Sequence, residues 1–170
     1  MKTIIISSSL SLNSKSYLLC EAVLKLLKKE ATCELIDLRK LKLNPFHMQK
    51  TSQMVTISKK IQKADNIVIG MGVHNYSIND NLKILLDNCF DGAQGKLYGV
   101  LCAAGGERSF LSTMHLTQIC MNEWRMIQLP RVVYATRKDF DEKKITSKEI
   151  LLRIEDFSKE FLLIGKKLLQ

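Results

Sequence analysis

Serine and amide side chains crowd residues 7–16, which read SSSLSLNSKS. An apolar run precedes this segment and an amphipathic pattern follows it, so it is expected between a strand and the start of a helix. Free backbone N–H groups and the helix dipole attract an anion there, and serine hydroxyls can donate to its oxygens. The absence of GxGxxG and GxxxxGK[ST] disfavours a Rossmann dinucleotide site or a P-loop. A phosphate-binding loop is one interpretation, and a serine-rich turn with one helix cap is the other.

Two later segments combine polar, aromatic and glycine residues. Residues 72–83 read GVHNYSINDNLK, and residues 103–109 read AAGGERS. The rings of His74 and Tyr76 are flat enough to stack on a ligand, although simple surface exposure is the alternative for both. The glycine pair permits a ligand to approach the backbone closely, although a tight strand-to-helix turn can use the same pair.

The hydrophobic pattern alternates between buried strands and amphipathic helices along the chain. Right-handed crossovers between such strands give an α/β fold, a three-layer doubly wound five-stranded parallel sheet with helices on both faces. Apolar runs predict strands at Lys2–Ser7, Cys33–Leu38, Asn66–Met71 and Leu97–Ala104, and a fifth within Met126–Ala135, which Pro130 interrupts. Helical spacing predicts helices from Ser14 onward, over Met54–Ala64, over Leu82–Phe90, up to about Asn122, and from about Thr146.

The positions of the three polar segments within this pattern carry the functional interpretation. They follow the first, third and fourth predicted strands. Ligands of open α/β sheets bind outside the carboxyl ends of the strands. We therefore expect the fold to bring the three segments together at one edge of the sheet.

The bulk composition indicates a single globular domain. The chain has 170 residues, of which 46% are hydrophobic and 25% charged, with only two prolines and eight glycines. We expect residues 1–170 to form one domain. The apolar run in MKTIIISSSL is too short for a signal peptide or a membrane span, and five scattered cysteines without a CxxC pair are typical of reduced, mostly buried thiols. A cytoplasmic protein without membrane association is expected.

The formal charge of +9 would suit either a phosphate-bearing cofactor or nucleic acid. Many of the lysines fall on predicted helix faces, where a solvated surface is the ordinary explanation. No helix-turn-helix or aromatic RNA-binding motif accompanies them. Nucleic acid is therefore not an expected partner.

Taken together, the three segments resemble those of the NADPH-dependent FMN reductases. In the first segment, the family pattern Gly-Ser-x-Arg-x-x-Ser-x-Asn matches at Ser9 and Ser14. Gly105 and Gly106 resemble the glycine-rich segment that approaches the flavin in that family. The likeness covers roughly residues 2–121 and implies a flavodoxin-like fold with strand order 2-1-3-4-5. In the second segment, the pattern Pro-Glu-Tyr-Asn-x-Ser-Ile-Pro-x-x-Leu-Lys-x-x-x-Asp aligns without a gap and matches at Asn75, Ser77, Ile78, Leu82, Lys83 and Asp87.

The resemblance implies that the three segments bind FMN. It implies no catalytic acid, nucleophile or metal, because the flavin itself carries hydride and electrons. The implied phosphate-binding residues are Ser9, Ser11, Ser14, Lys15 and Ser16. The implied ring-contacting residues are Gly72, Val73, His74, Asn75, Tyr76, Ala104, Gly105 and Gly106.

Several positions depart from the family pattern. Ser11 stands where many relatives have arginine, and Ser16 stands where they have asparagine, so a charged phosphate contact is missing unless Lys15 replaces it. In the second segment, Gly72, Val73 and His74 replace proline, glutamate and tyrosine, and Asn79 replaces a proline. These replacements preserve backbone contacts to the flavin but make side-chain stacking less secure.

The implied activity is transfer of a hydride from NADPH or NADH through bound FMN to a small-molecule electron acceptor, such as a flavin, quinone, azo compound or metal ion. The resemblance also implies a homodimer or homotetramer. The apolar, methionine-bearing stretch Leu111–Trp124 suits a subunit interface, and it suits an ordinary core helix better.

Three other functions stay open at this point. The departures at Ser11, Gly72, Val73 and His74 are compatible with a flavodoxin-like binding or regulatory module whose flavin binding is weakened or lost. Electron carriage of the flavodoxin type is a nearer alternative, although such carriers are typically acidic and this chain is basic. Catalysis by Cys102 is remote, because the sequence offers no base to activate its thiol.

Overall fold

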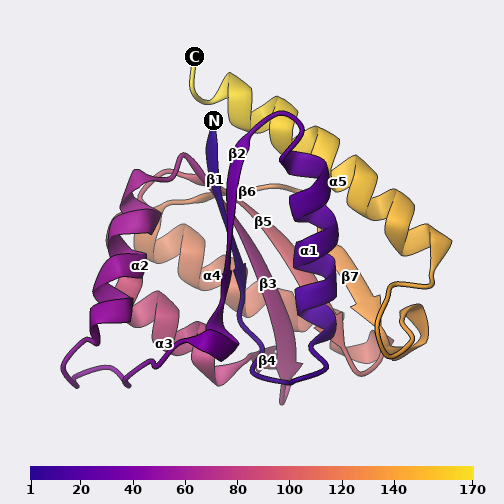
Figure 1. Cartoon of the computed structure of the whole chain (residues 1–170), viewed down its shortest axis with the longest axis horizontal. Coiled ribbons are helices and arrows are strands. Elements are labelled where there is room, and N and C mark those ends of the chain that lie inside the picture. Colours follow the sequence, from indigo (N-terminus) through magenta and orange to yellow (C-terminus); the bar gives the residue numbers. More distant parts are fainter.

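A central sheet with helices on both sides makes up the computed structural model, which describes residues 1–170 (Figure 1). It contains three short 3-10 turns, which are η1 (Leu38–Lys40), η2 (Glu107–Ser112) and η3 (Arg137–Asp139). The strands are β1 (Lys2–Ser7), β2 (Thr32–Asp37), β3 (Asn66–His74), β4 (Ser77–Ile78), β5 (Leu97–Ala104), β6 (Ile127–Gln128) and β7 (Val133–Thr136). The helices are α1 (Lys15–Leu27), α2 (Ser52–Lys63), α3 (Asp80–Cys89), α4 (Thr113–Trp124) and α5 (Lys148–Lys167).

The strand order confirms the predicted fold class, which is α/β with a flavodoxin-like parallel sheet. Hydrogen bonds join the strands in the order β2-β1-β3-β5-β6, and β7 also pairs with β5. All of these pairs are parallel. With β6 and β7 taken as the two halves of one interrupted strand, and the small β4 set aside, the order is the predicted 2-1-3-4-5.

The sheet has seven strands rather than five, for two local reasons. Pro130 has no N–H to donate, and it lies between β6 and β7, which pair with different parts of β5. The third strand also runs three residues beyond the predicted Met71, because Val73 and His74 pair antiparallel with β4. Residues 72–74, expected in a loop, therefore belong to the end of β3.

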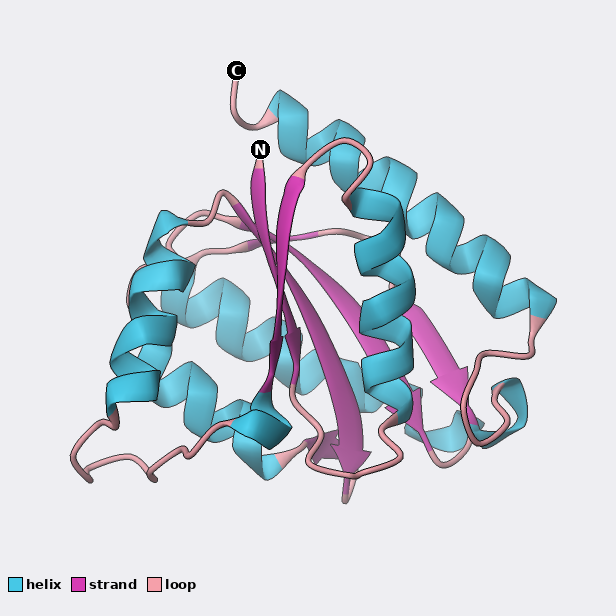
Figure 2. Ribbon diagram, viewed as in Figure 1, coloured by secondary structure: helices cyan, strands magenta, loops and turns pink.

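The helices divide between the two faces of the sheet (Figure 2). α1 and α5 cover one face over a core of 16 buried hydrophobic residues, and α2, α3 and α4 cover the other over a core of 26. α5 packs closely on β5: a Cβ on Gly99 would lie 2.4 Å from the ring of Phe157. Burial on both faces explains why β1, β3 and β5 read as continuous apolar runs.

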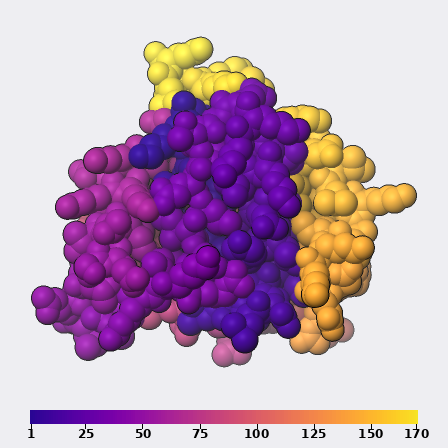
Figure 3. All heavy atoms as spheres, viewed as in Figure 1, coloured from indigo at the N-terminus to yellow at the C-terminus, as the bar shows by residue number.

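The carboxyl ends of the parallel strands emerge at one edge of the sheet, at the bottom in Figure 2. The register sets Ser7 of β1 beside Gly70 of β3, and Gly72 beside Ala103 of β5. The space-filling view shows that α1 and β2 cover the middle of the visible face, while α5 borders it above and to the right (Figure 3). None of the helices combines the length and apolar character needed to cross a membrane.

Candidate functional site

The segment after β1 leaves several backbone donors free. β1 ends at Ser7, and α1 begins at Lys15 with Ser14 as its N-cap, whose hydroxyl accepts a hydrogen bond from the Tyr17 N–H at 3.1 Å. Free N–H groups next to a helix N-terminus form a site suited to an anion such as phosphate. The backbone N–H groups of residues 8–16 that donate to no protein acceptor are those of Ser9, Leu10, Leu12, Asn13, Ser14, Lys15 and Ser16.

The polar side chains of this segment differ in availability. The Ser9 hydroxyl accepts from the Ser11 N–H at 3.3 Å in an exposed position. The Ser14 and Ser16 hydroxyls lie 3.2 Å apart and are buried. Lys15 turns away, because its ammonium donates to the carbonyls of residues 141 and 142 in the loop after β7. The structure thus gathers the predicted serines but not the predicted lysine.

The second segment forms a tight hairpin. Val73 pairs with Ile78 and His74 with Ser77, so the turn consists of Asn75 and Tyr76. Both have positive φ, 48° and 63°, as a type I′ turn requires. Asn tolerates this conformation, whereas a bulky residue such as tyrosine is strained in it. Backbone strain of this kind persists where other contacts hold the residue in place, and it concentrates at functional sites.

A hydrogen bond from Tyr76 joins this hairpin to the third segment. The phenol donates to the carbonyl of Arg108 at 2.8 Å, and the Tyr76 side chain is otherwise exposed. His74 is also exposed, with its Nδ1 3.8 Å from an oxygen of Asp80. The structure therefore brings Tyr76 to the glycine-containing turn, whereas His74 points to a carboxylate at the start of α3.

Neither the backbone conformation nor the packing within the protein requires glycine at positions 105 and 106. Neither has a positive φ, and Gly106 has the extended value of −165° that any residue can adopt. A Cβ built on either glycine meets no atom within 4 Å. The space that a side chain would fill is open and next to the predicted Ala104, so a flat ring can lie directly on this backbone. This fit supports the interpretation of a ligand-contacting turn.

Tyr134 of β7 holds the same turn from the other side. Its hydroxyl donates to the Gly106 carbonyl at 2.7 Å and lies 2.9 Å from the Ser109 hydroxyl. Desolvation raises the pKa of this phenol, so it is protonated at neutral pH and can donate. Sequence patterns gave no indication of this contact, because Tyr134 lies 28 residues from Gly106.

Two buried residues outside the predicted set join the first segment to the second. Asn79 donates from its amide nitrogen to the Ser8 carbonyl at 3.0 Å, and its amide oxygen accepts from the Ser8 hydroxyl at 2.7 Å. The same oxygen lies 3.4 Å from the Gly72 nitrogen. The only sequence signal was that Asn79 stands where the family pattern has a proline.

Arg39 of η1, the turn that follows β2, supports the first segment. Its guanidinium pairs with Asp37 at 2.7 Å, lies 4.3 Å from the ring centroid of Tyr17, and donates to the Leu12 carbonyl at 3.2 Å. Burial of Asp37 works to raise the pKa of its carboxyl, but hydrogen bonds from Arg39 outweigh it and lower the pKa overall. The charge of Arg39 beside the free N–H groups is therefore already neutralised.

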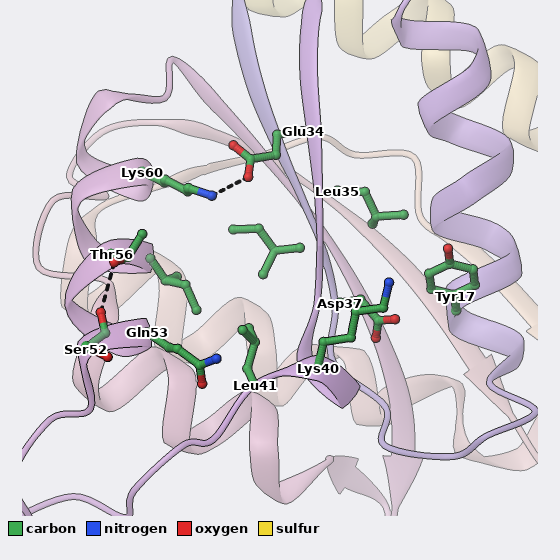
Figure 4. A pocket seen from close by; sticks show the side chains of 12 residues that line it. Tyr17, Glu34, Leu35, Asp37, Lys40, Leu41, Ser52, Gln53, Thr56 and Lys60 are labelled. Carbon is green, nitrogen blue, oxygen red and sulfur yellow. Dashed lines mark hydrogen bonds and ion pairs between the residues drawn. The ribbon is translucent and has the colours of Figure 1, made fainter.

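Cavities lie both at the site and away from it. One of about 720 Å³ opens at the glycine turn and is lined by Tyr76, by residues 105–109 and by residues 136–138. Another, of about 350 Å³, lies along the free edge of β2 between Tyr17 of α1 and the α2 side chains, where Lys60 pairs with Glu34 (Figure 4). This second cavity contains none of the predicted site residues.

No activated nucleophile lies at the site. Cys102, near the end of β5, is fully buried, and burial raises the pKa of its thiol to about 12. A thiol with such a pKa is neutral and inert near neutral pH. The arrangement of free N–H groups, an open glycine turn and supporting tyrosines can bind and orient a ligand, but it supplies no reacting group of its own.

Comparison with known proteins agrees with this geometry. The sequence matches the family model of the NADPH-dependent FMN reductases over residues 1–141. No curated protein matches the sequence. Among solved structures, the apo form of EMOB, an NADH:FMN oxidoreductase, aligns with a TM-score of 0.81 and 16% identity, over 96% of this chain and 89% of that one.

Two further structures show the same fold. An oxidoreductase from Corynebacterium diphtheriae aligns with a TM-score of 0.78 and 19% identity, over 98% of this chain and 97% of that one. A flavodoxin from the domain Archaea aligns with a TM-score of 0.71 and 16% identity, over 98% and 99%. Because the family model covers most of the sequence, the chain belongs to the NADPH-dependent FMN reductase family and is an NAD(P)H-dependent oxidoreductase.

Proposed function

We propose that this chain binds FMN across the segments after β1, β3 and β5. We propose further that it passes a hydride from NADPH or NADH through the bound flavin to a small acceptor such as a flavin, quinone, azo compound or metal ion. One observation carries the proposal: free N–H donors and an open glycine turn lie at one sheet edge, on segments that Asn79 and Tyr76 join.

The phosphate of FMN would lie in the segment after β1. Free backbone N–H groups, including those at the start of α1, supply the donors, with the hydroxyls of the half-buried Ser9 and the exposed Ser11 beside them. Ser14 and Ser16 shape the helix start. No free cation joins this set, since Lys15 and Arg39 both have other partners. We therefore expect FMN to bind through backbone dipoles rather than through an ion pair.

The flavin ring would lie against Gly105 and Gly106, with the end of β3 and the Asn75–Tyr76 turn beside it. Glycines without internal constraints leave room for this contact. Bound FMN supplies the hydride and electron chemistry. The protein residues orient the ring: Tyr134 and Tyr76 fix the glycine-containing segment, and Asn79 fixes the spacing of the first two segments.

The proposal extends to domain organisation, cellular location and assembly. We propose that residues 1–170 form one flavin-binding domain, that the protein is cytoplasmic, and that it assembles as a homodimer or homotetramer. Exposed apolar side chains beside α4 support the assembly: Leu111, Met114, Met121 and Ile127. A groove of about 620 Å³ lies among the last three of these residues.

A substitution at the glycine turn tests the proposed site. Because a Cβ on Gly105 meets open space, Gly105→Val should fold normally and yet lose FMN binding, measured by quenching of FMN fluorescence and by the melting temperature. Gln94→Val is the matched control, since it places an exposed valine in the turn before β5 at the opposite sheet edge. Equal FMN affinity in Gly105→Val and the unmodified protein would contradict the proposed ring position.

Measurements on the unmodified protein distinguish a flavin reductase from a regulatory module that binds no flavin. A reductase should be yellow as purified or after addition of FMN, release FMN on denaturation, and oxidise NADPH or NADH steadily with a quinone or free flavin. A colourless protein whose melting temperature does not respond to FMN would favour the regulatory module. Flavin binding without steady NAD(P)H oxidation would instead favour an electron carrier.

A further inference from the structure

The cavity at the glycine turn has a strongly basic wall. It has a volume of about 720 Å³ and opens between the segment after β5 and the residues that follow β7. Its charged lining residues are Glu107, Arg108, Arg137 and Lys138. Lys138 pairs with Glu107, which cancels one positive charge. Two arginines therefore give the cavity its net charge.

These two arginines differ from the others in the chain. The sequence contains six arginines. Four of them donate side-chain hydrogen bonds to protein acceptors: Arg39, Arg125, Arg131 and Arg153. The guanidinium groups of Arg108 and Arg137 alone make no hydrogen bond or ion pair with the protein. Ten donors in two planar forks are thus left free, and both forks line the same cavity.

The backbone at both arginines is nevertheless held in place. The Arg108 carbonyl accepts a hydrogen bond from the Tyr76 phenol. Arg137 begins η3, whose start is fixed by Asp139: this carboxylate accepts from the Thr136 N–H at 2.7 Å and from the Thr136 hydroxyl at 3.0 Å. Asp139 is engaged in this way and does not pair with Arg137. Anchored backbones that present unpartnered guanidinium groups suit recognition of an anion from outside the chain.

We propose that Arg108 and Arg137 together bind the 2′-phosphate of NADPH, and that they make this chain prefer NADPH to NADH. The inference rests on the proposed function and adds its coenzyme selectivity. A phosphate monoester carries close to two negative charges, and guanidinium forks match its oxygens with two parallel hydrogen bonds each. The diphosphate bridge common to both coenzymes offers only one charge per phosphorus, so it matches two adjacent forks less well.

The cavity is separate from the proposed FMN phosphate site. None of residues 7–16 lines it, and Lys15 is held by the carbonyls of residues 141 and 142. The glycine turn and Tyr76, which the proposed function places beside the flavin ring, border the cavity. A coenzyme placed on the flavin ring can therefore reach the arginines without displacing the flavin phosphate.

Binding of nucleotide fragments tests the inference without any turnover. We expect 2′,5′-ADP to bind the FMN-loaded protein at least about tenfold more tightly than 5′-ADP by calorimetry, because only the 2′-phosphate makes charge-assisted contacts with the two arginines. Arg137→Gln and Arg108→Gln should each remove this difference. Lys59→Gln, which removes one exposed charge from α2, should keep it. Equal affinity of the unmodified protein for the two fragments would overturn the inference.

Steady-state kinetics supply the second readout. In Arg137→Gln the KM for NADPH should rise about tenfold, while the KM for NADH and both kcat values stay close to those of the unmodified enzyme. Arg137→Lys should recover part of the loss through its remaining charge. Equal losses for NADPH and NADH would overturn the inference, because they would assign the arginines to the shared diphosphate.

The two proposals can fail separately. A protein that never binds FMN yet distinguishes 2′,5′-ADP from 5′-ADP would refute the flavin reductase and leave the phosphate site in place. A yellow protein that oxidises NADH and NADPH with equal efficiency would refute the phosphate site and leave the reductase in place.

Discussion

Asn79 occupies the N-cap position of α3, yet its side chain bonds Ser8 instead of capping the helix. No side-chain hydrogen bond caps α3. The Asn79 amide instead exchanges two hydrogen bonds with Ser8, 71 residues earlier, and both residues are buried. An asparagine at a helix start normally stabilises that helix. Here its hydrogen bonds hold the segment after β1 against the end of β3, which fixes the distance between the proposed phosphate and ring positions.

Asn79→Ala should lower both the stability and the FMN affinity. The variant leaves the buried Ser8 carbonyl without its donor, which costs about 1–3 kcal/mol of the free energy of unfolding. The Ser8 hydroxyl keeps the Gly70 carbonyl as an acceptor at 2.9 Å. Urea denaturation with and without FMN measures the two effects. The control is Asn122→Ala, an exposed position on α4. A loss of stability with unchanged FMN affinity would show that the hydrogen bonds between Ser8 and Asn79 stabilise the fold but do not contribute to FMN binding.

Tyr134→Phe should weaken FMN binding severalfold with little change in stability. The substitution removes only the hydroxyl that holds Gly106 and Ser109. Tyr98→Phe is the control, because it also removes a phenol hydroxyl, but one that donates to Gln128 of β6 and not to the glycine turn. Fluorescence titration with FMN and the visible spectrum of the bound flavin report on the turn. Unchanged affinity in Tyr134→Phe would mean that the glycine turn keeps its shape without this support.

The Asp37–Arg39 pair predicts a dependence of stability on pH. The pKa of Asp37 is lower in the folded protein than its unfolded value of about 3.9, so ionised Asp37 stabilises the fold above that pH. This contribution disappears as the pH falls through the folded-state pKa. The melting temperature of Asp37→Asn should therefore lie below that of the unmodified protein at pH 7, and the difference should shrink below about pH 4. Asp91→Asn, at an exposed ion pair with Lys50, is the control substitution.

The thiols should be unreactive in the native protein. Cys20, Cys89, Cys102 and Cys120 are buried, and burial raises the pKa of Cys120 as well as Cys102 to about 12. At pH 8 a thiol reagent should label no more than the half-buried Cys33, whereas all five cysteines should react in denaturant. Cys102→Ala should retain hydride transfer. Rapid native labelling of Cys102, with loss of activity, would restore the cysteine alternative.

The sequence predicted those parts of the fold that depend on local patterns. The bounds of β1 and β5 agree with the apolar runs at Lys2–Ser7 and Leu97–Ala104, because strands buried on both faces need continuous apolar residues. Ser14, where the first helix was expected to start, caps α1. The end of β3 was missed because the polar His74 breaks the apolar pattern, and its pairing depends on the hairpin partner β4.

The supporting contacts of the candidate site could not be predicted in the same way. The clamp between Ser8 and Asn79 and the bond from Tyr134 to Gly106 join positions that are far apart in sequence. Only the final packing brings such residues together. The stretch Leu111–Trp124 contributes to the core, as one interpretation predicted, through the buried Leu116 and Cys120. Leu111 and Met121 are exposed, and the subunit interface stays a prediction.

The exposed side of that stretch leads to a prediction about assembly. Leu111 is 68% exposed, Met114 54%, Met121 50% and Ile127 44%, so four large apolar side chains are exposed on and beside α4. A contiguous exposed apolar patch usually marks an interface. A second copy of the chain buried against it would also cover the end of η2, which begins at the glycine turn.

Sedimentation velocity should therefore show a dimer or larger species that Met121→Glu dissociates. Leu163→Glu, at an equally exposed position on α5, should leave that species intact. A dimer that survives Met121→Glu but not Leu163→Glu would instead place the interface on α5, at the opposite face of the sheet.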